Sequence, residues 1–183
     1  KAKQKGGFES LGIDTWGVDF GLLDEHGDLL ESAVHYRDDR TIGMQEEVFK
    51  AISKEEVYNL TGNQFENFNT IFQLYSLVQK RPWILERADT LLLTPDLFNY
   101  FLTGEKKAEY TMASTTQLMD AKNKVWSDRI LDALRIPKKL LPEIVPSGTV
   151  VGTLRSSICE ELGVESAKVI AIAGHDTQSA VVS

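Results

Sequence analysis

The sequence predicts an α/β fold with a mixed sheet, and three observations support this class. Short apolar runs typical of strands alternate with segments whose apolar residues recur at helical spacing. The 183 residues are 42% hydrophobic and 26% charged, which is ordinary for a globular chain long enough to bury a core. Neither an internal repeat nor a low-complexity tract interrupts the alternation. We therefore expect one domain, or a large piece of one.

The expected strands begin near the start of the chain. Ser10 to Ile13 has the pattern of a strand, and Val18 to Leu23 is expected to be its partner, joined through Gly17. Leu29 and Leu30 are expected to return as a third short strand. Further strands are expected at 90–93 and at 169–173, where apolar residues run without interruption.

Helices are expected between these strands. The capping and spacing signals predict helices over 44–52, 53–62, 71–82, 94–104, 126–134 and 156–163. Ser53 and Glu56 have the spacing of a capping box, and Gly62 and Gly163 the place of terminating glycines.

Two of these helices have a predicted buried face. The first face consists of Ile71, Leu74, Tyr75 and Val78, repeating at i, i+3, i+4 and i+7. In the helix over 94–104, Thr94 is expected to be the N-cap and Pro95 the first helical residue. Its buried stripe is expected to consist of Leu97, Phe98, Phe101 and Leu102.

Composition disfavours several classes of protein. Cys159 is the only cysteine, so neither an intrachain disulfide nor a cysteine-based zinc cluster can form, and we expect a cytoplasmic protein. The net charge is −7 and the pI is about 5.0, which disfavours nucleic acid as a partner because a basic face is needed to bind phosphates. No apolar run reaches the ~18 residues of a membrane helix, so we expect no membrane partner.

Both ends of the sequence suggest an excised internal segment of a longer protein. Lys5 followed by Gly6 and Gly7 is typical of a helix end, so residues 1–7 are expected to be the tail of a helix. A cloning remnant or a flexible basic arm is the alternative. At the other end, the apolar strand over 169–173 is followed only by the start of a helix.

Gly174-His175-Asp176-Thr177 is the strongest candidate for chemistry. It follows an apolar strand and opens a helix, and ligands of α/β sheets collect outside the carboxyl ends of strands. A carboxylate there can accept a proton from a substrate hydroxyl, and nearby helix N–H groups would keep it ionised. The alternative is that Asp176 or Thr177 only caps the helix, with His175 as a hydrogen-bonded structural residue.

A second candidate site spans residues 14–19. A strand ends at Asp14, the following turn exposes Trp16, and Gly17 permits close approach of the backbone. A Trp beside exposed backbone amides suits the face of a sugar. The alternative is a hairpin with the Trp in the core.

The other polar segments leave their roles open. Residues 35–40 carry four charges in six positions, which either hold a polar ligand or a lid, or form a solvated turn with weak surface pairs. Asn69 or Thr70 is expected to cap the next helix. The polar segments 109–111 and 114–117 show no chemistry in their spacing. The sequence contains no G-x-S-x-G, Walker A, G-x-G-x-x-G or H-E-x-x-H motif.

Taken together, these segments resemble the rhamnulokinase branch of the FGGY carbohydrate kinases. The stretch SLGIDTWGVDF at 10–20 is similar to its signature, and HDTQSA at 175–180 closes the order. Between them, similar segments lie at 36–41, 62–74, 95–104 and 109–118. The first and last segments are specific to the branch, whereas the middle ones are shared more loosely within the family.

The resemblance implies an actin-like, ribonuclease-H-like domain with a mixed sheet flanked by helices. It implies phosphorylation of L-rhamnulose at O1 with Mg²⁺-ATP, a step of rhamnose catabolism. Asp176 matches the family's proton acceptor, and Gly17, His175, Asp176 and Thr177 match its sugar-binding positions. Trp16 lies beside Gly17, and its place in the sugar site is our inference from chemistry.

The resemblance also implies that 1–183 is a partial N-terminal, sugar-binding domain. The family's phosphate-binding strands would precede Lys1 and its ATP-binding domain would follow Ser183. We therefore expect no cofactor-binding or metal-ligating residue here, and no activity of the chain alone. The alternatives are a kinase for another ketose or polyol, a noncatalytic sugar-binding module, or a nuclease with metals at Asp14, Asp19 and Asp176, against which the acidic composition argues.

Overall fold

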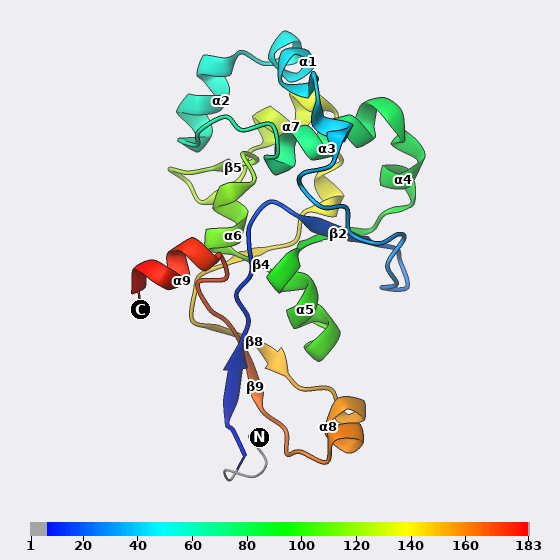
Figure 1. The fold of residues 1–183 in the computed structure, drawn as a ribbon, viewed down its shortest axis with the longest axis vertical. Coiled ribbons are helices and arrows are strands. Elements are labelled where there is room, and N and C mark those ends of the chain that lie inside the picture. Colours follow the sequence, from blue (N-terminus) through cyan, green and yellow to red (C-terminus); the bar gives the residue numbers. More distant parts are fainter. Residues whose placement is uncertain (1–6, 183) are drawn as a thin grey trace.

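The computed structural model describes residues 7–182, which form an elongated molecule with helices at one end and a sheet at the other (Figure 1). The strands of this part are β1 (Ser10–Gly12), β2 (Phe20–Leu23), β3 (Thr90–Leu93), β4 (Ala108–Glu109), β5 (Met119–Asp120), β6 (Val125–Trp126), β7 (Ile144–Val145), β8 (Thr149–Thr153) and β9 (Lys168–Ala171). The helices are α1 (Met44–Ala51), α2 (Lys54–Thr61), α3 (Thr70–Lys80), α4 (Pro82–Arg87), α5 (Thr94–Thr103), α6 (Tyr110–Thr115), α7 (Asp128–Leu134), α8 (Ser156–Leu162) and α9 (Asp176–Val182). Short 3-10 turns lie at Asp39–Thr41 and Lys138–Leu140.

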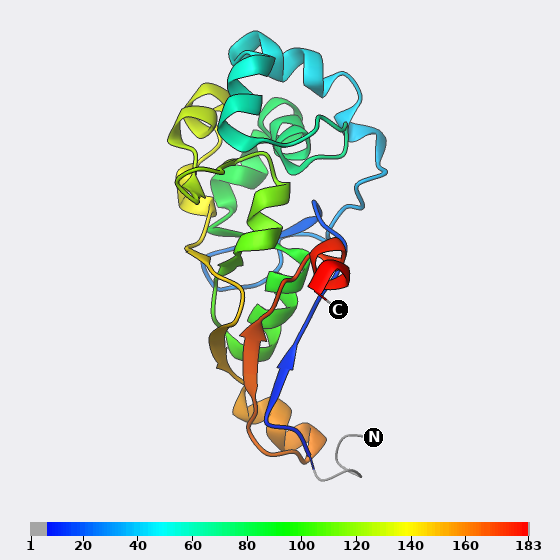
Figure 2. The same cartoon turned by 90° about the vertical axis from the view of Figure 1, so that its left-hand side faces the viewer.

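The predicted α/β class with a mixed sheet is confirmed. The largest sheet has the order β1-β9-β8, in which β1 and β9 are parallel and β8 is antiparallel to β9. Figure 2 shows β1 and β9 side by side, both running toward the helical end. The parallel pair therefore carries its carboxyl ends to the middle of the molecule.

The expected pairing of the first two strands is wrong. β2 pairs instead with β3, antiparallel, with Phe20 opposite Leu93. Every residue of β2 and β3 is buried, whereas β1 is only partly buried. A strand buried on both faces is most stable beside another such strand, which explains why β2 pairs with β3 and not with the partly exposed β1.

Two main hydrophobic clusters follow this division. The larger one joins helices α1, α3, α4 and α7 to β2 and β3, with Val48, Phe72 and Ile130 fully buried within it. The smaller one lies on the β1-β9-β8 sheet and includes Val151 and Val169. The segments that connect the two clusters lie between them, at the carboxyl ends of β1 and β9.

Local signals placed several helix ends correctly. Ser53 caps α2 by accepting the N–H of Glu56 at 3.2 Å, and Gly62 ends that helix in the left-handed conformation with φ 69°. Gly163 ends α8 in the same way. The expected reciprocal contact of the capping box is replaced, because the Glu56 carboxylate binds Arg129 at 2.6 Å.

The apolar face predicted for α3 is confirmed, since Ile71, Leu74 and Tyr75 are buried and Val78 packs against the core, but burial is not confined to that face. Its residues from Thr70 to Leu77 are all buried. Asn69 occupies the N-cap position of α3, as predicted, but its side chain makes no capping bond. Asn69 Nδ2 donates to Gln117 Oε1 at 2.8 Å, and the Thr70 hydroxyl donates to the Val18 carbonyl at 2.9 Å. These polar groups hold neighbouring loops against α3.

The buried stripe predicted for α5 is confirmed at Leu97 and wrong at its two phenylalanines. Phe98 and Phe101 are 48% and 40% exposed, while Asp96 is buried at 2%. Thr94 begins the helix instead of capping it, since its hydroxyl donates to the Asp19 carbonyl at 3.2 Å. This tertiary contact sets which side of α5 faces inward.

Several observed elements were not predicted, namely α6 and the strands β4, β5, β7 and β8. Residues 125–126 form β6, so α7 begins at Asp128 after an N-cap at Ser127. Pro82 begins α4, which was not predicted. Leu29 forms only a single bridge with Leu23 instead of a strand. The helix tail expected at 1–7 lies, except for Gly7, outside the described residues.

Candidate functional site

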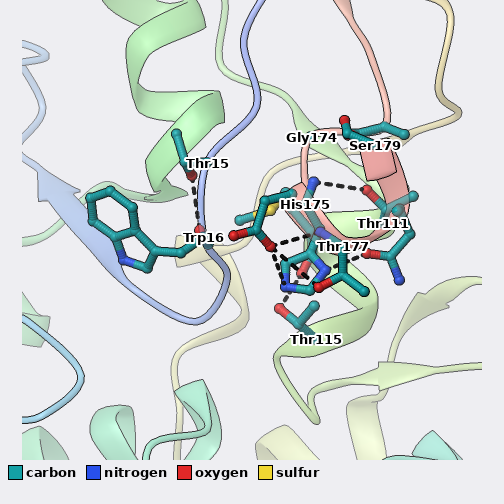
Figure 3. A network of polar contacts seen from close by, with 12 residues as sticks. Thr15, Trp16, Thr111, Thr115, Gly174, His175, Thr177 and Ser179 are labelled. Carbon is teal, nitrogen blue, oxygen red and sulfur yellow. Dashed lines mark hydrogen bonds and ion pairs between the residues drawn. The ribbon is translucent and has the colours of Figure 1, made fainter. Parts of the chain in front are cut away.

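The loops after β1 and β9 lie side by side. The Thr15 N–H donates to the Gly174 carbonyl at 2.9 Å, and the Asp176 N–H donates to the Thr15 carbonyl at 2.8 Å. Figure 3 shows these segments together, with Thr111 and Thr115 of α6 next to His175. The two candidate loops thus meet at the ends of neighbouring strands, while the roles of their side chains stay predictions.

The alternative of a hairpin with a core Trp at 14–19 is wrong. The Trp16 side chain extends from the turn and the residue is 46% exposed. Its indole N–H donates to Asp19 Oδ2 at 2.8 Å. This contact fixes the orientation of the ring while one of its faces stays open to a ligand.

The turn contains one strained residue, and it is not Gly17. The backbone of Val18 has φ 68°, a left-handed conformation that a β-branched residue rarely adopts, at a cost of order 1–3 kcal/mol. Its carbonyl is held by the Thr70 hydroxyl at 2.9 Å and by Gln73 Nε2 at 3.1 Å. Two buried donors of α3 therefore maintain the shape of the turn.

Glycine is needed at position 17 because there is no space for a side chain, and not because the backbone adopts a left-handed conformation there. A Cβ at this position would lie 2.9 Å from His175 Cδ2 and 3.3 Å from Thr115 Oγ1. Any side chain at 17 would therefore displace His175 or close the gap between the two loops.

A cleft of about 530 Å³ opens beside these loops, within the size range of small-molecule sites. It is lined by residues from three separate parts of the chain: Trp16, Gly17, Val18, Tyr36, Arg37, Asp38, Asp39, Thr41, Ile42, Asn67, Phe68, His175 and Asp176. The cleft thus combines apolar rings with several charged groups.

Asp176 lies at the mouth of this cleft with its side chain 54% exposed. It is the first residue of α9, so the N-cap position belongs to His175. Asp176 Oδ1 accepts the Thr177 N–H at 2.7 Å and lies 3.6 Å from His175 Nε2. The other ring nitrogen, His175 Nδ1, contacts Gln178 Oε1. Among the described residues, Thr177 is not part of the cleft lining.

The individual residues of the opposite wall of the cleft were not identified from the sequence. Tyr36 packs edge-on against Phe68 with ring centroids 5.4 Å apart, and the Arg37 guanidinium lies 5.5 Å from the Tyr36 ring. Asp38 caps the short helical turn that follows by accepting the Arg40 N–H at 2.9 Å. Of the two interpretations of 35–40, the lining position favours a role in ligand contact.

A buried polar layer supports this wall from below. Asp19 is 3% exposed, and burial raises its pKa above the ordinary value, opposed mainly by the hydrogen bond from Trp16. Burial also lowers the pKa of Arg40, whose Nη2 donates to Gln73 Oε1. Gln73 Nε2 donates in turn to the carbonyls of Val18 and Phe68.

A second buried layer supports the other loop, in a segment where spacing showed no chemistry. Glu109 is 1% exposed and accepts the Gly174 N–H at 3.2 Å. The Glu109 N–H itself donates to Asp96 Oδ1 at 3.1 Å. Burial raises the pKa of Asp96 to about 8; the hydrogen bond from the Glu109 N–H opposes this shift, and the nearby Glu109 carboxylate adds to it. Asp96 therefore holds a proton at neutral pH.

Within residues 7–182, no group of three or more His, Cys, Asp and Glu side chains is arranged to hold a metal ion. Asp19 is directed to Trp16 instead of toward Asp14 and Asp176, so the arrangement required by the nuclease alternative is not formed. Among the described helices, none is both long enough and apolar enough to span a membrane.

Comparison with known proteins identifies the family. Residues 4–183 match the N-terminal domain of the FGGY family of carbohydrate kinases. This chain belongs to the FGGY family. It is 50% identical over 174 residues to a rhamnulokinase of Oceanobacillus iheyensis, a match that covers 95% of this chain and 37% of the relative. A rhamnulokinase of Halalkalibacterium halodurans is 48% identical with the same coverage.

Solved structures of FGGY-type sugar kinases share the fold. A ligand-bound xylulose kinase from Lactobacillus acidophilus matches with a TM-score of 0.83 at 22% identity, over 93% of this chain and 36% of that one. A glycerol kinase from Plasmodium falciparum with ADP matches with a TM-score of 0.79 at 22% identity, over 96% of this chain and 35% of that one. The actin-like fold expected from the resemblance is confirmed, and the chain spans just over a third of these proteins.

Proposed function

We propose that this chain is the sugar-binding part of an ATP-dependent kinase that phosphorylates L-rhamnulose, with Asp176 as the general base. The observation that carries the proposal is the cleft, in which the half-exposed Asp176 carboxylate and the open Trp16 ring lie on neighbouring strand ends. The high identity to rhamnulokinases over nearly the whole chain supports this sugar over others.

In the proposed reaction, Asp176 accepts the proton of the sugar O1 hydroxyl as that oxygen bonds to the phosphorus of the transferred phosphoryl group. Mg²⁺-ATP, held by other parts of the whole protein, would supply this phosphoryl group, and ADP would leave with the electron pair of the broken phosphorus–oxygen bond. The Thr177 N–H donates to Oδ1 of Asp176, which leaves Oδ2 for the substrate. General-base catalysis of this kind contributes about 10²–10⁴-fold.

The sugar would lie between the two walls of the cleft. The rings of Trp16 and Phe68 offer apolar surfaces to its C–H faces, while Arg37 and Asp38 can exchange hydrogen bonds with its hydroxyls. Because Gly17 has no side chain, its contribution would come from its backbone and from the room it leaves.

The described residues do not fit Mg²⁺-ATP by themselves. They contain no suitable cluster of metal-ligating side chains. We therefore propose that the nucleotide binds to other parts of the whole protein. By this proposal the chain alone binds sugar at most.

The proposal is tested with the whole protein and its Asp176→Asn variant. Release of ADP would be measured with L-rhamnulose, and in parallel with other ketoses and polyols. We expect the highest kcat/KM with L-rhamnulose, and a kcat lowered about 10²–10⁴-fold by the Asn variant at unchanged melting temperature. Asn still accepts the Thr177 N–H, so the start of α9 is preserved.

Three results would count against the proposal. Preference for another ketose or a polyol would reassign the substrate and retain the reaction. A kcat of the Asn variant within about threefold of wild type would return Asp176 to a structural role, because a general base contributes far more. Sugar binding without any ADP release would instead favour the noncatalytic module.

A further inference from the structure

A buried carboxylate lies under the segment that carries Asp176, and the proposed reaction does not use it. Glu109 is the last residue of β4 and the residue before α6, and it is almost completely inaccessible. A buried carboxylate is unfavourable unless its oxygens are hydrogen-bonded. Its bonding partners therefore indicate what the group holds in place.

The partners of Glu109 come from three parts of the chain. Oε2 accepts the backbone N–H groups of Thr111 at 2.9 Å, Met112 at 3.2 Å and Gly174 at 3.2 Å. Oε1 accepts the hydroxyl of Ser147 at 2.5 Å. The bonds to Thr111 and Met112 cap α6, which is an ordinary structural role, whereas the bond to Gly174 is not needed for the helix.

Thr111 extends this contact by one residue. Its hydroxyl donates to Glu109 Oε2 and accepts the His175 N–H at 3.3 Å. The backbone N–H groups of the two residues before Asp176 are thus both linked to Glu109. The Gly174 N–H binds it directly, and the His175 N–H binds it through the Thr111 hydroxyl. Figure 3 shows Thr111 beside Gly174 and His175 in this arrangement.

The opposite side of the same segment is fixed by backbone contacts. Thr15 binds the Gly174 carbonyl and the Asp176 N–H at 2.9 and 2.8 Å. The segment is therefore held between the turn at 15 and the Glu109–Thr111 pair. Removal of either support would let Asp176 move relative to the cleft, and a displacement of about 1 Å can cost about 10²-fold in rate.

We infer that Glu109, acting through Gly174 and Thr111, is a positioning residue for the Asp176 carboxylate. This inference rests on the proposed role of Asp176 as the base. Glu109 does not contact the cleft, and its effect is to keep Asp176 at the position from which it reaches the sugar hydroxyl.

Two variants of the whole protein separate positioning from folding. In Glu109→Gln, the amide oxygen can still accept from Gly174, and the amide NH₂ can donate to the Ser147 hydroxyl, so the fold is expected to persist. The charge-assisted bonds become neutral ones of about half the strength. In Thr111→Val, the shape is kept and the acceptor for the His175 N–H is lost.

Each variant has a matched control. Thr116→Val removes a buried hydroxyl at the end of the same helix, where it bonds only Ala113 and Leu118. Glu143→Gln removes the charge of an exposed carboxylate that pairs with Lys107 at the surface. Both controls are expected to keep wild-type kinetics.

The measurements are kcat, both KM values, and the ¹⁵N amide signals of Gly174 and His175. We expect Glu109→Gln and Thr111→Val to lower kcat about 10–100-fold, with KM for ATP unchanged and the two amide signals shifted. A purely structural role would lower the melting temperature without this selective loss of kcat.

The outcomes distinguish this inference from the proposed function. If Asp176→Asn is inactive while Glu109→Gln and Thr111→Val keep kcat within about threefold of wild type, the inference is overturned and the function stands. If the wild type phosphorylates no sugar, the proposed function and the inference fail together. Unchanged amide signals of Gly174 and His175 in both variants would also overturn the inference.

Discussion

The two loops that form the candidate site are held in place by different chemistry. The turn around Trp16 and Val18 is fixed by neutral side chains of α3 that bind its carbonyl, and by one contact from the indole to Asp19. The segment before Asp176 is fixed through its N–H groups by the buried Glu109. The α3 side chains that hold the first loop are thus donors, whereas the Glu109 side chain that holds the second loop is an acceptor.

This difference has a consequence for the free energy of each loop. The folded conformation of the first loop has a cost in free energy from backbone strain, since Val18 stays in a left-handed conformation. The support of the second loop has a cost in free energy because two acidic groups, Asp96 and Glu109, are buried next to each other. The first cost is independent of pH, whereas the second changes with protonation.

The largest expected effect, on KM for the sugar, comes from a substitution that makes the two loops clash sterically. In Gly17→Val, the new side chain would overlap His175, because a Cβ at residue 17 would lie 2.9 and 3.0 Å from two atoms of that ring. We expect KM for L-rhamnulose to rise about 100-fold, because His175 and Asp176 must move, while KM for ATP stays within about threefold.

Gly17→Ala provides the graded control, with a smaller rise in KM for the sugar. Melting temperatures of both variants show whether the fold has been kept. Equal KM values for L-rhamnulose in wild type and the Val variant would mean that the two loops do not bind one sugar.

A second prediction concerns only the support of the second loop. The folded pKa of Asp96 is about 8 against an ordinary value of 3.8, so between these pH values the folded state binds one more proton than the unfolded state. Stability contributed by this group is fully present below about pH 4 and is lost as pH rises toward about 8. The loss is at most about 1.4 kcal/mol per pH unit.

Asp96→Asn removes this proton linkage. We expect the free energy of unfolding to decrease less between about pH 5 and pH 8 in the variant than in wild type, as measured by denaturant titration at each pH. Asp128→Asn, at an exposed carboxylate paired with Lys138, is the control and should follow the wild-type curve. If the free energy of unfolding changes with pH to the same extent in Asp96→Asn and in wild type, the raised pKa of Asp96 is contradicted.

The smallest effect is expected in the first loop. Trp16→Phe keeps an aromatic face in the cleft but removes the donor to the buried Asp19. We expect a loss of about 1–3 kcal/mol in the free energy of unfolding, from the unpaired acceptor. KM for the sugar should rise only a few-fold. Isothermal titration with L-rhamnulose, combined with melting curves, would reveal a larger change if the indole N–H itself binds the sugar.

The features predicted correctly from sequence depend on a few adjacent residues. Gly62 and Gly163 mark helix ends because a left-handed residue is required there, and this requirement is local. The place of Asp176 after an apolar strand followed from the rule for strand ends, and the family resemblance added its role. Such signals lie within a few positions of the residues that they predict.

The features that were missed depend on partners far away in the chain. β1 pairs with β9, with Ser10 opposite Lys168, and no local pattern specifies such a partner. The rotation of α5 follows from the bond between Thr94 and Asp19. Glu109 was not identified because a buried and an exposed carboxylate have the same sequence signal.

Gln73 illustrates how such a distant connection limits change over evolutionary time. Its one side chain binds the carbonyls of Val18 and Phe68 and the guanidinium of Arg40, so three segments around the cleft share a single anchor. A substitution at this position would disturb all three segments at once, and selection would remove it whichever sugar was favoured. New sugar preferences should therefore arise in lineages through the outward residues, such as Arg37 and Ile42, while the anchor stays constant.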